Sequence, residues 1–182
     1  MENKETIETI QNFDFSDGLI EKISITHNRI EVLFEKRDGK KFHFIFRESF
    51  YLRNNMSINV SISHVEVEPL KKGISETLDN ILETYEGESL PNLIRFFDSW
   101  ENECVLEILA TFIDVMRLTT CSECEGDYYQ STSEMESLCP ECSNILYGYK
   151  NCTHEFESNR CVRCFWNGRT SDYLKNRSED EK

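Results

Sequence analysis

Eight side chains that can bind a metal ion lie between Cys121 and Cys164. They form four close pairs: Cys121 and Cys124, Cys139 and Cys142, Cys152 and His154, and Cys161 and Cys164. Two residues between cysteines let one tight turn direct two thiolates at a common centre, and two such turns complete a tetrahedral zinc site. The spacing therefore predicts two structural zinc ions, each with four protein ligands.

The four pairs can combine in two ways. In a sequential arrangement the first two pairs bind one ion and the last two pairs bind the other. In a crossed arrangement Cys121, Cys124, Cys152 and His154 share one ion. We favour the sequential arrangement because the order of the pairs does not match that of RING domains. Disulfides or solvated thiols are the alternative to zinc, and a reducing compartment argues against disulfides.

The segment from Cys121 to Cys142 resembles a zinc ribbon, in which two Cys-x2-Cys knuckles project from adjacent hairpins. Pro140 inside the second knuckle fits that family, whereas Glu125 and Ser143 stand where a glycine commonly follows the knuckle. The resemblance implies metal binding but no particular function, because ribbons serve nucleic-acid, protein and purely structural roles.

Residues 19–68 alternate apolar and polar side chains, as in Ile30, Val32 and Phe34, which is typical of half-buried strands. Asp38 and Gly39 form a favoured hairpin turn between two of these runs. Ser75 can cap a short amphipathic helix that ends before Gly87. The pattern predicts an α+β fold, an antiparallel β-meander domain with one short helix, followed by a small zinc-binding module.

Residues 93–118 fit two patterns. Their apolar positions form a helical stripe, yet many are β-branched, and residues 98–102 look like a hairpin loop. We favour a hairpin over a helix. The predicted division of the chain is a β-rich α+β domain at 1–118, a two-zinc module at 119–167 and a flexible tail at 168–182.

Composition and charge exclude several classes of protein. Hydrophobic residues make up 38% of the chain and charged residues 30%, which favours a folded protein over a disordered one. The formal net charge of −14 repels nucleic acid and anionic membranes, so a basic protein surface is the better partner. Because no signal-like start or membrane-length apolar run is present, we expect a cytoplasmic protein without a membrane association. We also predict no small-molecule substrate.

Two groups of residues are candidates for binding a partner. Around the second ligand group, Arg160, Arg163, Trp166 and Arg169 could neutralise and stack on a single nucleic-acid strand, or they could simply cover the zinc site. Near the first group, Glu123 and Tyr128 suit a partner with arginine or lysine, although this segment could also be a solvated acidic loop.

The pattern argues against catalysis, because a catalytic zinc keeps an open position while each group here supplies four ligands. A Cys104 nucleophile with His27, His43 or His64 is a minor alternative without a supporting motif. The N-terminal part loosely resembles bacterial immunity-type proteins that block a basic effector. We therefore expect a non-catalytic zinc-binding interaction protein of bacterial or phage type, an adaptor or an inhibitor. The alternatives are a nucleic-acid-binding regulator and an enzyme whose site forms only with a partner.

Overall fold

The computed structural model describes residues 7–8, 10–26, 29–87 and 89–175. The chain divides into two compact units, Met1–Val115 and Met116–Lys182. The predicted domain boundary after residue 118 therefore lies three residues beyond the observed division. The described residues form mostly antiparallel sheet with few helices.

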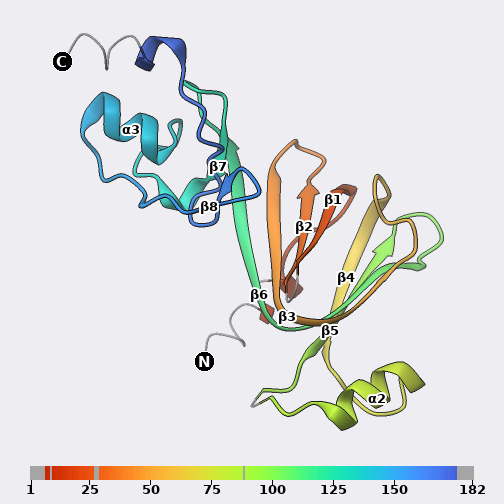
Figure 1. Ribbon diagram of the computed structural model, residues 1–182. Helices are drawn as coiled ribbons and strands as arrows, with labels where there is room; N and C mark the ends of the chain where they lie inside the picture. The colour runs from red at the N-terminus through yellow and green to blue at the C-terminus, as the bar shows by residue number, and fades with distance from the viewer. Residues whose placement is uncertain (1–6, 9, 27–28, 88, 176–182) are drawn as a thin grey trace. The chain divides into compact units, whose positions relative to one another are not determined.

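The first unit is built on six strands: β1 (Gly18–Thr26), β2 (Arg29–Glu35), β3 (Lys41–Asn54), β4 (Ser61–Pro69), β5 (Asn92–Asp98) and β6 (Cys104–Thr120). They are ordered β3-β2-β1-β4-β5-β6, and an additional pairing of β3 with β6 closes the sheet into a barrel (Figure 1). Strand β6 begins in the first unit and ends in the second.

The predicted meander is correct only in part. Strands β1 to β3 form one meander and β4 to β6 form another, but β4 pairs with β1, where Leu19 lies opposite Ser61, and not with β3. An alternating pattern specifies which side chains face the core, whereas it says nothing about which strand lies next to which. The sequence therefore predicts the strands but not the closure of the barrel.

The predicted hairpin at 93–118 is confirmed, with Ile94 of β5 opposite Ile108 of β6. These two side chains face the barrel interior, while their neighbours Leu93 and Leu109 pack in a second cluster with Leu78 of helix α2 (Glu76–Thr84). Both faces of this hairpin are buried, so its sequence lacks the strict alternation of a half-buried strand.

Helix α2 begins as predicted, because the Ser75 side chain accepts a hydrogen bond from the backbone of Leu78 at 3.3 Å. Inside the barrel, aromatic rings dominate the core. Phe15 packs edge-to-face on Phe34 at 5.3 Å and stacks on Phe44 at 5.5 Å between ring centroids.

The second unit contains short elements: β7 (Asp127–Tyr129), the 3-10 helix η1 (Gln130–Thr132), α3 (Pro140–Tyr147), β8 (Phe156–Glu157) and β9 (Arg160–Cys161). Strand β7 pairs with the end of β6, and β8 pairs with β9. The core consists of the predicted ligand cysteines together with Tyr128, Leu138, Trp166 and Leu174.

The predicted flexible tail differs from the structure at its beginning. Leu174 is only 1% exposed and packs in the cysteine-rich core, so the packed unit extends at least to Lys175. Residues 176–182, the rest of the predicted tail, lie outside the described residues. In the described part of the chain, no helix has both the length and the apolar character needed to cross a membrane.

Candidate metal centre

The eight predicted ligands gather in two groups in the second unit. Cys121, Cys124, Cys139 and Cys142 form the first group, and Cys152, His154, Cys161 and Cys164 form the second. Within each group the potential ligand atoms all lie within 4.8 Å of one another. The pairs therefore combine sequentially, as we favoured, and not in the crossed arrangement.

The first cysteine pair lies in a knuckle whose backbone is closed by two hydrogen bonds. The amide of Glu125 donates to the carbonyl of Cys121, and the amide of Cys121 donates to the carbonyl of Gly126, both at 2.9 Å. Glu125 has a φ of 57°, in the left-handed region that favours glycine. The position at which ribbons commonly carry glycine thus keeps the same backbone conformation here with a glutamate.

The knuckle of the second group repeats this design. Phe165 donates its amide to Cys161 at 2.7 Å, Cys161 donates to Trp166 at 2.8 Å, and Phe165 has a φ of 67°. Because Glu125 and Phe165, the residues after these two pairs, are left-handed, each of the two turns brings the thiols of its pair to one side.

The second pair of the first group is positioned by helix α3 instead of a left-handed turn. Cys139 is the N-cap, and its sulfur accepts a hydrogen bond from the amide of Cys142 at 3.5 Å. The positive end of a helix dipole stabilises a thiolate at this position. Ser143 continues the helix, which explains why no glycine is needed there.

The distances between sulfur atoms test whether zinc fits. Four thiolates at about 2.3 Å from a tetrahedral ion lie about 3.8 Å apart. The sulfur atoms of Cys124 and Cys139 are 3.8 Å apart, and those of Cys152 and Cys161 are 3.9 Å apart. A disulfide needs sulfur atoms at about 2.05 Å, and all eight cysteines of the chain are free thiols.

The surroundings of His154 and the electrostatics of the first group also indicate that these residues can bind metal ions. The Nε2 atom of His154 is buried without a hydrogen-bond partner, as expected for a ligand atom directed at a metal ion. In the first group, a hydrogen bond with Cys124 lowers the pKa of Cys121, while a hydrogen bond with Cys121 raises the pKa of Cys142. Four thiols this close can all ionise only with a cation between them. The two groups are compatible with two structural zinc ions.

Glu141 connects the two groups, a role that the sequence analysis missed. It lies on α3 between Cys139 and Cys142, yet its carboxylate approaches Nδ1 of His154 at 3.8 Å. The same carboxylate accepts a hydrogen bond of 2.6 Å from the side chain of Asn151, next to the ligand Cys152. Carboxylates near the second ring nitrogen of a ligand histidine commonly orient the ring. The sequence feature that could have indicated this role is the position of Glu141 between two ligand cysteines.

Two of the predicted partner-binding residues are buried. Tyr128 is fully buried, and its hydroxyl donates a hydrogen bond to the carbonyl of Glu136 at 2.8 Å. Burial raises the pKa of Tyr128, and the charges of the neighbouring cysteines raise it further. Trp166 is 6% exposed, and its ring lies 4.8 Å from that of His154. Both rings are part of the cover of the ligand groups, so neither offers a surface for stacking or docking.

The predicted basic patch is engaged by neighbours within the second unit. Arg160 lies over the ring of Phe165 at 4.7 Å and pairs with Asp127 at 3.8 Å. Arg163 donates to the hydroxyl of Thr153 at 3.0 Å, and Arg169 pairs with Glu125 at 3.9 Å. Arg160 and Arg169 thus pair with acidic residues near the first ligand group, whereas Arg163 contacts Thr153 and Glu155 within the second, although exposed pairs of this kind contribute little stability.

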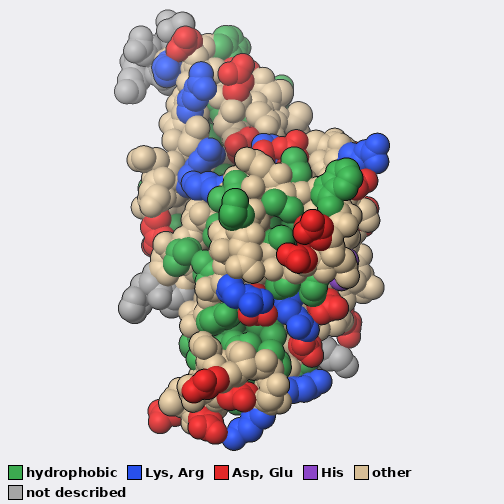
Figure 2. Space-filling model, turned by 90° about the vertical axis from the view of Figure 1, so that its right-hand side faces the viewer, with side chains coloured by type: hydrophobic (Ala, Val, Ile, Leu, Met, Phe, Trp, Pro, Cys, Tyr) green, Lys and Arg blue, Asp and Glu red, His purple; other side chains and the backbone are tan. Residues whose placement is uncertain are grey.

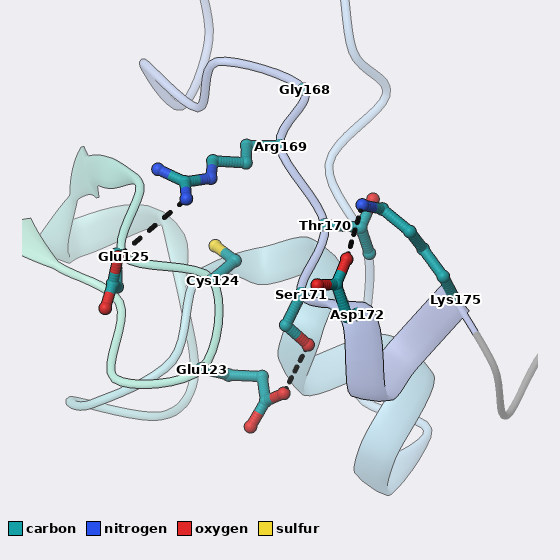
Figure 3. Close-up of a pocket in the computed structure, with 9 residues that line it drawn as sticks. All are labelled: Glu123, Cys124, Glu125, Gly168, Arg169, Thr170, Ser171, Asp172 and Lys175. Atoms are coloured by element: carbon teal, nitrogen blue, oxygen red, sulfur yellow. Dashed lines mark hydrogen bonds and ion pairs between the residues drawn. The ribbon is translucent and has the colours of Figure 1, made fainter.

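A polar pocket of about 480 Å³ lies beside the first knuckle (Figure 3). Glu123, another predicted partner-binding residue, accepts a hydrogen bond there from the hydroxyl of Ser171. Lys175 donates to Asp172 at 2.9 Å. The contact of Ser171 with Glu123 therefore joins two segments of the pocket wall, whereas Lys175 and Asp172 pair within one segment.

The structure separates Cys104 from the described histidines proposed as its catalytic partners. Phe97 lies between His64 and Cys104 in the sheet register, with its ring stacked on His64 at 4.6 Å. His43 is buried beside Glu31 at 3.3 Å, and His27 lies outside the described residues. Burial also raises the pKa of Cys104, which disfavours a reactive thiolate.

Comparisons of the chain with protein-family models, with curated proteins and with solved structures give no match.

Proposed function

We propose that this chain is a non-catalytic docking protein that binds a basic protein partner through the Trp100 loop, residues 98–103, while zinc holds the second unit in shape. The observation that carries the proposal is the exposure of Trp100, whose side chain is 88% exposed. Tryptophan is among the residues most enriched at the energetic centre of protein interfaces.

The loop that presents Trp100 is fixed by one carboxylate. Asp98, only 7% exposed, accepts hydrogen bonds from the amides of Trp100 and Glu101, each at 2.7 Å, and from that of Glu103 at 3.0 Å. These donors lower the pKa of Asp98, with the amide of Glu101 contributing most. A loop held in one conformation loses less entropy when it binds, so the indole is preorganised for docking.

Further apolar side chains are exposed in the adjoining loop between β3 and β4. Ser99 donates its amide to the carbonyl of Ser61 at 2.9 Å, so the Trp100 loop lies beside the start of β4, where the β3–β4 loop ends. Met56 in the adjoining loop is 86% exposed and Ile58 is 46% exposed. Figure 2 shows that exposed hydrophobic side chains on one face of the molecule lie between charged ones.

Charge supports a basic partner. Glu101 and Glu103 follow Trp100 within the same loop and are both exposed. The chain as a whole carries a formal net charge of −14. Charge complementarity of this kind accelerates association and excludes acidic partners and nucleic acid.

The ligand sets support a structural and not a catalytic role for the metal. The residues named above would hold each zinc ion with four protein ligands, which gives the second unit cross-links and leaves no coordination position for water or a reactant. We further propose that the first ligand group is zinc-ribbon-like, because Cys121 and Cys124 lie in a knuckle closed by two backbone hydrogen bonds and a left-handed residue, and Pro140 lies inside the second pair.

The test is an affinity capture from the native host with three forms of the intact zinc-loaded protein: the wild type, Trp100→Ala and Ile25→Ala. Ile25 is 64% exposed and lies near the C-terminal end of β1, whereas the N-terminal end of β1 pairs with the start of β4 beside the Trp100 loop. Ile25→Ala therefore serves as the matched control. We expect one basic protein to be retained by the wild type and by Ile25→Ala but not by Trp100→Ala. Removing an indole anchor costs about 2 kcal/mol or more, roughly a 30-fold loss of affinity.

Three results would contradict the proposal. The first is a partner that all three forms retain equally. The second is retention of nucleic acid that weakens with salt, which would restore the nucleic-acid-binding alternative. The third is turnover of a substrate by the purified protein in the absence of any partner.

A further inference from the structure

A groove of about 540 Å³ lies between the middle of strand β3 and the C-terminal end of helix α2. The apolar wall of the groove consists of Phe50, Ile81 and Tyr85. The lining also includes two acidic residues, Glu48 and Glu86. All of these residues belong to the first unit, and the groove shares none of its lining with the Trp100 loop. The groove is therefore a second surface, separate from the docking surface proposed at the Trp100 loop.

The aromatic wall of the groove is preformed. Phe50 is 44% exposed and packs edge-to-face on Tyr85 with ring centroids 5.2 Å apart. The hydroxyl of Tyr85 donates a hydrogen bond of 2.7 Å to the carbonyl of Ser89, which fixes the second ring. Aromatic faces held in this way attract a cation by their quadrupoles and bury an aliphatic chain by the hydrophobic effect.

The electrostatics of the groove favour a cation. Its described lining includes two exposed carboxylates, Glu48 and Glu86, and no arginine, lysine or histidine. The last turn of α2 also contains no basic residue, so the negative end of the helix dipole is not compensated within the helix. The nearby Lys72 is engaged by Glu83 at 3.0 Å.

We propose that this groove binds an arginine side chain of the basic protein partner. The aliphatic stem would pack against Phe50, Ile81 and Tyr85, and the guanidinium would face the carboxylates of Glu48 and Glu86 and the end of α2. Arginine suits the site better than lysine, because its planar head stacks on aromatic rings and pairs with carboxylates at the same time. This inference rests on the proposed docking function and names a second contact of the same partner class.

The experiment uses a defined peptide instead of the unidentified partner. An acetylated and amidated peptide with two arginines flanking a leucine is titrated into the intact zinc-loaded protein, and amide shifts are followed by heteronuclear NMR. The matched probe replaces both arginines with citrulline, which keeps the shape of the side chain and removes its charge. We expect shifts at residues 48–50 and 81–87 with the arginine peptide and no shifts there with the citrulline peptide.

Protein variants test the carboxylates. Glu48 has a φ of 50°, so Glu48→Gly removes the charge at a position whose backbone suits glycine. Combined with Glu86→Gln, this change should weaken binding of the arginine peptide about tenfold, the loss expected for two exposed carboxylates. Glu76→Gln, in the first turn of the same helix, is the matched control and should bind the peptide like the wild type.

The inference is overturned if shifts appear elsewhere, if the citrulline peptide binds equally well, or if the double variant keeps the affinity of the wild type. The peptide titration does not involve Trp100, so it can fail independently of the capture experiment. A failed titration with successful capture by the Trp100 loop would reject the groove alone. A successful titration with capture that does not depend on Trp100 would reject the proposed loop alone.

Discussion

Glu141 provides a direct test of how the two ligand groups depend on each other. Glu141→Gln removes the charge that lies 3.8 Å from Nδ1 of His154 while keeping a side chain that can accept from Asn151. Outer-shell partners of ligand histidines contribute roughly 10- to 100-fold to metal affinity. Because 3.8 Å is longer than a direct hydrogen bond, we expect the lower end of this range, about tenfold or 1.4 kcal/mol, at the second group.

The assay is competition for zinc with a chelator of known affinity, resolved into two dissociation constants. Cobalt substitution assigns the constants to the groups, because a site with four thiolates and a site with three thiolates and one imidazole absorb differently. Glu134→Gln removes one exposed acidic charge from the same unit and is the matched control. Unchanged or tighter binding at the second group of Glu141→Gln, or an equal loss in Glu134→Gln, would refute the orienting role.

Three further predictions concern the loop, the first knuckle and the metal. The amides around Asp98 lower its pKa below the ordinary value of 3.8. Their stabilisation of the loop is therefore complete above pH 3.8 and is lost as the pH falls through the lower pKa of the folded state. Carboxyl NMR should show a titration midpoint of Asp98 below 3.8, and a midpoint at or above 3.8 would contradict this prediction. Glu125→Gly should stabilise the zinc-loaded protein by about 0.5 to 1 kcal/mol in denaturant unfolding, because glycine relieves the strain of the left-handed backbone at this position. The control Glu123→Gly should not stabilise the protein. Destabilisation by Glu125→Gly would show that the ion pair of Glu125 with Arg169 contributes more than the backbone strain costs. Cys142→Ala should reduce the bound zinc from two ions to one, while retention of both ions would mean that the remaining three cysteines suffice.

The ligands and strands could be predicted because each depends on local spacing. Two residues between cysteines restrict the backbone to a turn, whether the turn is a knuckle, as at Cys121, or a helix N-terminus, as at Cys139. Alternation likewise assigns Val32 and Phe34 to the core without reference to the rest of the chain. The sequential grouping followed from the order of the pairs.

Features that depend on distant neighbours could not be predicted in this way. The pairing of β3 with β6 closes the barrel, but nothing within either strand specifies its partner. Tyr128 and Trp166 look like interface residues beside charged neighbours, yet a unit this small needs large rings to cover its ligands. Conversely, Trp100 stood in a loop that the sequence analysis recognised, and its exposure became evident only with the fold.

The central claim is that two closed four-ligand metal sites hold the second unit in shape. Zinc X-ray absorption spectroscopy on freshly purified protein, with elemental analysis of the same sample, tests it most directly. The account predicts two zinc ions per chain and an average coordination of 3.5 sulfur atoms and 0.5 nitrogen atoms per ion, since the seven cysteines and one histidine divide over two ions. Fewer than two zinc ions, or an oxygen atom from water in the inner coordination sphere of either ion, would contradict it.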